Sequence, residues 1–171
     1  MTRKLCFNKE RIHVGLVIKG ILLLSLFLFP MRVYALGVGE RSPDFRAVTI
    51  KGEQISYDRD LKGKKPVYLV FWTTWCPYCK VELPQIEELY KKYGDRVEFI
   101  GVSLGIKNKI GRFVREKKLS FPIVYDEGNK IAGAFGAQIQ TNLLIDKRGV
   151  IVYKGKGFEE DIVKRLKKLA E

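Results

Sequence analysis

The sequence predicts an α/β fold with a mixed, partly parallel sheet, on three observations. An uninterrupted apolar run at residues 67–72 has the length of a buried strand, and an amphipathic helical pattern follows it. The same order recurs, with a strand at 96–104 and a helix at about 109–118. Alternating segments within 45–57 and 141–155 are typical of antiparallel hairpins.

The other elements follow from local signals along the chain. Lys51-Gly52 predicts the turn of the N-terminal hairpin. Pro77 suits the first position of a helix, and apolar residues at a spacing of three and four continue that helix to Gly94. A short strand, a short helix and a closing helix are expected at residues 121–126, 129–135 and 159–170.

Residues 1–35 differ from the rest of the chain. Basic residues open the segment, and an uninterrupted apolar run, Gly20–Phe29, follows them. This run is shorter than the ~20 residues of a spanning helix, and the small-residue spacing up to Ala35 fits a cleavage site. We expect residues 1–35 to be a secretory signal cut after Ala35, with an uncleaved membrane anchor as the alternative. Either one places a single domain, residues 36–171, in the periplasm or at the outer face of the cytoplasmic membrane.

The charge of the chain is strongly positive. Lysine and arginine number 32 against 19 acidic residues, for a formal net charge of +13, which falls to +8 without residues 1–35. The densest basic cluster, Lys107–Lys118, has apolar residues at helical spacing and is expected to be a solvated helix face. A patch for an acidic partner or a membrane surface is the alternative. No nucleic-acid binding is expected of an exported domain without a recognition motif.

Cys76 and Cys79 are the two cysteines of residues 36–171, because Cys6 and the single histidine, His13, lie in the N-terminal segment. Two ligands are too few for a zinc site within one chain, and no histidine is left for Cys-His catalysis. A disulfide at this spacing would close a tiny loop and constrain the unfolded chain little. Redox chemistry is therefore the expected role, with no metal and no other cofactor.

The expected helix begins directly after Cys76, which makes this residue its N-cap. Unpaired backbone N–H groups and the helix dipole favour a thiolate there. Cys79 lies about one turn further, where its sulfur can attack a mixed disulfide formed on Cys76. We expect Cys76 to be the exposed attacking thiol and Cys79 the buried resolving thiol. Glu82 lies on the same helical face and, if partly buried, would have a raised pKa suited to proton exchange with a cysteine; an ordinary surface carboxylate is the alternative.

The stretch Phe71–Pro84, FWTTWCPYCKVELP, resembles the TlpA/ResA-like branch of the thioredoxin superfamily. Further segments that correspond to that family lie at residues 39–45, 61–72, 121–126 and 143–149. The resemblance implies a thioredoxin fold, a central mixed β-sheet flanked by helices, with an added N-terminal β-hairpin. It also implies that Glu82 is the active-site glutamate, whereas Val70 stands where cytoplasmic thioredoxins have a buried aspartate.

One segment departs from this family. Gln140 stands where the family has a cis-proline opposite the cysteines. A non-proline cis peptide costs about 3–4 kcal/mol, so the Ile139–Gln140 bond is expected to be trans. In the family this loop presents backbone groups to the substrate chain, as an added strand would. The expected substrate-binding residues flank the cysteines or lie in this loop: Trp75, Pro77, Tyr78, Ile139, Gln140 and Thr141.

The resemblance also implies a function. It implies an extracytoplasmic thiol-disulfide oxidoreductase that reduces disulfides of exported proteins, with electrons from a membrane thiol donor and apocytochrome c among the substrates. Three alternatives stay open: a disulfide-forming oxidase, a non-turnover thioredoxin-like adaptor, and a metal chaperone, the last disfavoured by the lack of histidine and methionine near the cysteines. We expect a monomer.

Overall fold

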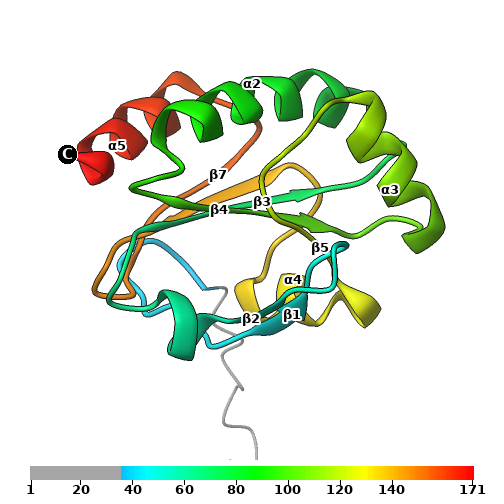
Figure 1. Cartoon of the computed structure of the whole chain (residues 1–171). Coiled ribbons are helices and arrows are strands. Elements are labelled where there is room, and N and C mark those ends of the chain that lie inside the picture. Colours follow the sequence, from blue (N-terminus) through cyan, green and yellow to red (C-terminus); the bar gives the residue numbers. More distant parts are fainter. Residues whose placement is uncertain (1–35) are drawn as a thin grey trace, which may run out of the picture. The chain divides into compact units, whose positions relative to one another are not determined.

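The computed structural model describes residues 36–171 (Figure 1). The signal or anchor expected at residues 1–35, with its cleavage site, lies outside the described residues. Within residues 36–171, no helix combines the length and the apolar character that crossing a bilayer requires.

A five-stranded mixed sheet forms the centre of the domain. Its strands are β3 (Val67–Trp72), β4 (Glu98–Ser103), β5 (Ile123–Tyr125), β6 (Thr141–Ile145) and β7 (Ile151–Lys156). Their order across the sheet is β5-β4-β3-β6-β7. β4 pairs in parallel with β3 and β5, whereas β6 pairs antiparallel with β3 and β7. The expected mixed sheet is confirmed.

β3 is the central strand and is buried along its whole length. Its side chains alternate between two core clusters, one on each face of the sheet. The residues in one cluster are Val67, Leu69 and Phe71, and those in the other are Tyr68, Val70 and Trp72. A strand covered on both faces requires such an uninterrupted apolar run, and the run is what made β3 predictable.

Helices and a hairpin cover the two faces of the sheet (Figure 1). The helices on one face are α2 (Pro77–Tyr93), α3 (Lys107–Glu116) and α5 (Glu160–Ala170). On the other face lie α4 (Lys130–Phe135) and the hairpin of β1 (Arg46–Val48) and β2 (Gln54–Ser56). This is the expected thioredoxin fold with an added N-terminal β-hairpin.

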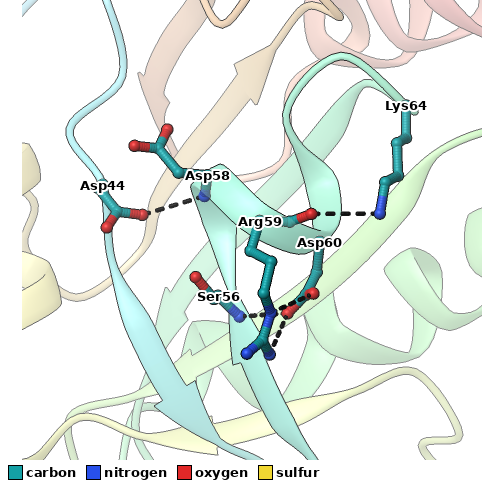
Figure 2. A network of polar contacts seen from close by, with 6 residues as sticks. All are labelled: Asp44, Ser56, Asp58, Arg59, Asp60 and Lys64. Carbon is teal, nitrogen blue, oxygen red and sulfur yellow. Dashed lines mark hydrogen bonds and ion pairs between the residues drawn. The ribbon is translucent and has the colours of Figure 1, made fainter.

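A single π-helical turn, η1 (Tyr57–Leu61), follows the hairpin, and no pattern in the sequence indicates it. The Asp60 carboxylate accepts hydrogen bonds from the Ser56 backbone N–H at 2.8 Å and from the Arg59 guanidinium at 2.8 Å (Figure 2). The bond from Arg59, with that from Ser56, lowers the pKa of Asp60 to about 2. Tyr57, 1% exposed, anchors the turn in the core. The turn thereby fastens the hairpin to the sheet.

Candidate active site

Cys76 and Cys79 lie just past the end of β3, where the chain enters α2. Cys76 is the N-cap of α2, and its Sγ accepts a hydrogen bond from the Cys79 backbone N–H at 3.3 Å. Pro77 occupies the first helical position, where its missing N–H costs nothing. The expected N-cap position of Cys76 is confirmed.

Neither cysteine is open to solvent. Cys76 is 3% exposed and Cys79 1%, both in the dithiol form. The expectation of an exposed Cys76 is therefore wrong. The physical reason is that Cys76 packs in the core cluster on this face of the sheet, and the Gln140 side chain reaches its sulfur from the opposite loop, with Nε2 at 3.6 Å from Sγ. The exposed side chains beside the pair are those of Trp75 and Tyr78, at 62% and 74%.

The environment of Cys79 disfavours its thiolate. Burial raises the pKa of Cys79 to about 12, and the hydrogen bond with Cys76 and the charges of Cys76 and Glu82 act in the same direction. A backbone hydrogen bond at Thr73 opposes them. Cys79 therefore needs a base to remove its proton before it can attack.

Glu82 lies one turn further along α2 and is 5% exposed. Burial raises its pKa, and a hydrogen bond from the Asn142 Nδ2 to its Oε1, at 2.6 Å, opposes the rise. The expected burial and raised pKa of Glu82 are confirmed. A carboxyl group with a raised pKa holds a proton more readily than a surface glutamate, which suits it to proton exchange with a cysteine.

Asn142 is a site residue that the sequence did not reveal. It is fully buried in β6, and its Oδ1 accepts a hydrogen bond from the Tyr68 hydroxyl at 2.8 Å. Its Nδ2 donates to Glu82 and to the carbonyls of Gly157, at 2.9 Å, and Gln140, at 3.2 Å. The sequence did contain one signal for it, an asparagine within an apolar strand, because a buried amide side chain needs hydrogen-bond partners.

Gln140 lies in a β-turn that faces the cysteines. The Thr141 N–H donates to the Gln138 carbonyl at 2.9 Å, and Gln140, the third residue of the turn, has a φ of 72°. A positive φ at this position is that of a type II turn. The Gln140 N–H donates to the Phe71 carbonyl at 2.7 Å, and its carbonyl also accepts a bond from the Gly157 N–H at 2.8 Å. The backbone of Gln140 is therefore already bonded within the domain.

The other residues expected to bind substrate fall into two groups. Pro77 lies on the surface with the two exposed aromatic side chains beside the cysteines. Ile139 is half-buried and packs on the core, and Thr141 is buried, with its Oγ1 accepting a bond from the Gln138 N–H at 2.9 Å. The described residues have no cis peptide bond, so the expected trans bond before Gln140 is confirmed. The substrate-binding roles themselves stay predictions.

Comparisons with known proteins agree with this geometry. The sequence profile of the AhpC/TSA family matches residues 38–154. The thiol-disulfide oxidoreductase ResA of Bacillus anthracis is 38% identical over 141 residues, which cover 77% of this chain and 78% of that protein. The crystal structure of StoA from Bacillus subtilis superposes with a TM-score of 0.64 at 32% identity, over 74% of this chain and 97% of that one. A putative protein disulfide isomerase from Bacteroides thetaiotaomicron gives a TM-score of 0.71 at 29% identity, over 80% and 92%.

Proposed function

The chain belongs to the AhpC/TSA family and is a thiol-disulfide oxidoreductase, and we propose that it reduces disulfides of exported proteins through the Cys76–Cys79 pair. The observation that carries this proposal is the arrangement at the start of α2. One cysteine caps the helix and receives a backbone N–H on its sulfur, and the second lies one turn inward, buried beside a carboxylate of raised pKa.

The reaction consists of two exchanges. The Cys76 thiolate attacks one sulfur of the substrate disulfide, an S–S bond to Cys76 forms, the substrate bond breaks, and the released substrate thiolate takes up a proton. Cys79 then loses its proton and attacks the Cys76 sulfur, which forms the Cys76–Cys79 disulfide and releases the second substrate thiol. Two electrons pass from the dithiol to the substrate, and a thiol donor must return them for the next cycle.

Glu82 is proposed as the proton acceptor of the second exchange. Once Cys76 is in a mixed disulfide it carries no charge, so its two contributions to the high pKa of Cys79 disappear. Burial of Cys79 remains, and a base is still required. The glutamate on the same helical face, held by the Asn142 amide, is the candidate that the described residues offer.

The surface beside Cys76 favours polypeptide substrates. Trp75, Tyr78 and Val81 are each more than 60% exposed. Tyr78 and Val81 are three residues apart on α2 and share a helix face. Exposed apolar side chains gathered around a reactive group are typical of protein-binding surfaces. Trp75, Pro77 and Tyr78 are therefore the proposed docking residues.

The site of action and the partners rest on the sequence. A basic and then apolar segment at residues 1–35 supports export or anchoring, with the domain in the periplasm or at the outer face of the cytoplasmic membrane. By family resemblance we propose a membrane thiol donor as electron source and apocytochrome c cysteines as one substrate. The name of the Bacillus relative, a thiol-disulfide oxidoreductase, supports the proposed chemistry.

The experiment that tests the function traps its substrates. The variant Cys79→Ser should leave Cys76 in stable mixed disulfides with exported proteins, which mass spectrometry identifies after purification under non-reducing conditions. Cys76→Ser is the matched control. Absence of trapped proteins above this control, together with no insulin reduction by the wild type, would favour the non-turnover adaptor.

The direction of electron flow has its own measurement. Equilibration of the pair with glutathione gives its reduction potential. A value of about −270 mV supports a reductase, and one of about −120 mV supports a disulfide-forming oxidase.

A further inference from the structure

Gln140 approaches the reactive sulfur from outside the helix that carries it. Its Nε2 lies 3.6 Å from the Cys76 Sγ, and 64 residues separate the two in sequence. The side chain is held in place by its own backbone, because the N–H donates to Phe71 and the carbonyl accepts from Gly157 and Asn142. Because both the N–H and the carbonyl of Gln140 are hydrogen-bonded, the position of its Cα, and so the origin of its side chain, is fixed.

A positive φ is uncommon for a residue other than glycine, asparagine or aspartate. At 72°, Gln140 adopts the conformation that glycine would adopt more readily in a type II turn. The residue with this unfavourable backbone conformation lies directly opposite Cys76. An amide side chain here, in place of glycine, puts a donor within reach of the sulfur.

We propose that the Gln140 carboxamide is a catalytic hydrogen-bond donor that stabilises the Cys76 thiolate. A thiolate only accepts hydrogen bonds, so the amide presents its NH₂ group to the sulfur. The Cys79 backbone N–H is the second donor on the same atom, at 3.3 Å. The proposal rests on Cys76 being the attacking thiol of the proposed function, and it adds a residue from the opposite loop to that step.

The donor acts on one redox state more than on the other. Hydrogen bonds to a charged acceptor are stronger than those to a neutral one, so at a pH where Cys76 is a thiolate Gln140 stabilises the reduced form more than the disulfide. Stabilising the reduced form makes a dithiol pair more oxidising. Removal of the donor should therefore make the pair a stronger reductant.

The test compares three variants of the full chain. Gln140→Met keeps an unbranched side chain of similar length and removes the donor, and Gln140→Glu replaces the NH₂ group by a charged oxygen. Gln138→Met makes the same change at an exposed position in the same turn, without contact to the sulfur, and serves as control. Circular dichroism of each variant establishes that the fold is retained.

The main readout is the pH dependence of alkylation of the reduced protein by iodoacetamide, at pH 4 to 9. Cys79, with a pKa of about 12, stays protonated over this range, so the reaction reports Cys76. The midpoint, and not the limiting rate, is compared, because the substitution also changes the access of iodoacetamide to the sulfur. Gln140→Met should raise the midpoint by about 0.5–1 pH unit, equivalent to about three- to tenfold less thiolate below it.

The two other variants and a second equilibrium make the result decisive. Gln140→Glu should raise the midpoint further than Gln140→Met, and Gln138→Met should leave it unchanged. Above the midpoint, the glutathione equilibrium of Gln140→Met should shift toward the disulfide by the same factor, tenfold corresponding to about 30 mV. A Gln140→Met midpoint equal to that of Gln138→Met overturns the proposal. The alkylation midpoint and the glutathione equilibrium are measured without a protein substrate. Their outcomes are therefore independent of the insulin-reduction and trapping experiments that test the proposed function.

Discussion

Replacing Glu82 by glutamine should separate the two exchanges of the reaction. The amide keeps an oxygen that accepts the Asn142 bond and removes the ionisable group. The pKa of Cys79 is about 12 in the reduced protein, against an unperturbed 9.0. At pH 7 these limits correspond to thiolate fractions of about 10⁻⁵ and about 10⁻². A positioned base typically contributes about 10²–10⁴-fold to such a proton transfer. Glu82→Gln should therefore slow the second exchange at pH 7 by about 10²-fold or more.

The assay is a single turnover of the reduced enzyme with a peptide disulfide, stopped by acid and resolved by mass spectrometry. The wild type should show little mixed disulfide, because the second exchange follows quickly, whereas Glu82→Gln should accumulate it. The rate of the second exchange should rise with pH through the raised pKa of Glu82 in the wild type. In Glu82→Gln it should rise only with ionisation of Cys79 itself.

The control is Glu88→Gln, the same change at an exposed position of α2, where the carboxylate pairs with Lys91 at 2.7 Å. It should behave as the wild type. An unchanged second exchange in Glu82→Gln, with an unchanged pH profile, would refute the assignment of Glu82 as the base. Alkylation of Cys76 should stay close to normal in both variants, which shows that the first thiol is intact.

Three further outcomes are expected. Asn142→Ala leaves the buried hydroxyl of Tyr68 without its partner and should lower the free energy of unfolding by about 2–4 kcal/mol in a denaturant titration; a loss below 1 kcal/mol would contradict the role of this amide. Gln140→Pro removes the N–H that bonds to Phe71 and imposes a negative φ, so it should lower the free energy of unfolding by about 2–4 kcal/mol and change the rate of insulin reduction. A variant that matches the wild type in both would contradict a role of this turn in the reaction. Burial raises the pKa of Glu82 above 4.5, so the folded state binds this proton more tightly than the unfolded state. The free energy of unfolding should therefore fall as pH rises from about 4.5 through the folded pKa, and Glu82→Gln should lack this part of the decline in titrations at pH 4 to 8.

The parts of the fold that the sequence predicts are those with a local cause. β3 is an unbroken apolar run because both of its faces are covered, and α2 begins at Pro77, a residue suited to the first helical position, with Cys76 as its N-cap. The short helix α4 and the closing helix α5 lie within one residue of their expected starts, since each has a clear apolar spacing. The helix expected at about 109–118 begins two residues earlier, at Lys107.

The parts of the site that the sequence did not predict depend on contacts between distant segments. The bond from Tyr68 to Asn142 spans 74 residues, and that from Asn142 to Glu82 spans 60. The spacing of residues along the chain gives no indication of hydrogen bonds between segments so far apart. The side chain of Gln140, which the sequence marked only as a departure from the family, reaches the sulfur of Cys76 from 64 residues away. The sequence identified Gln140 as an unusual residue, but its contact with the Cys76 sulfur became visible only in the folded structure.

The burial of Cys79 also separates the second exchange from the surroundings of the protein. At 1% exposure, Cys79 is reached by a dissolved oxidant or a small thiol only when the structure around its sulfur opens. Cys79 belongs to the buried core cluster on this face of the sheet, so such openings are among the rarer and more costly fluctuations of the domain. A small molecule from solution needs this opening before it can react with Cys79, whereas the Cys76 sulfur, which lies in the same core cluster, does not. A mixed disulfide is thus resolved from within the protein, and the labelling rate of Cys79 in the reduced enzyme would measure how well this compartment is closed.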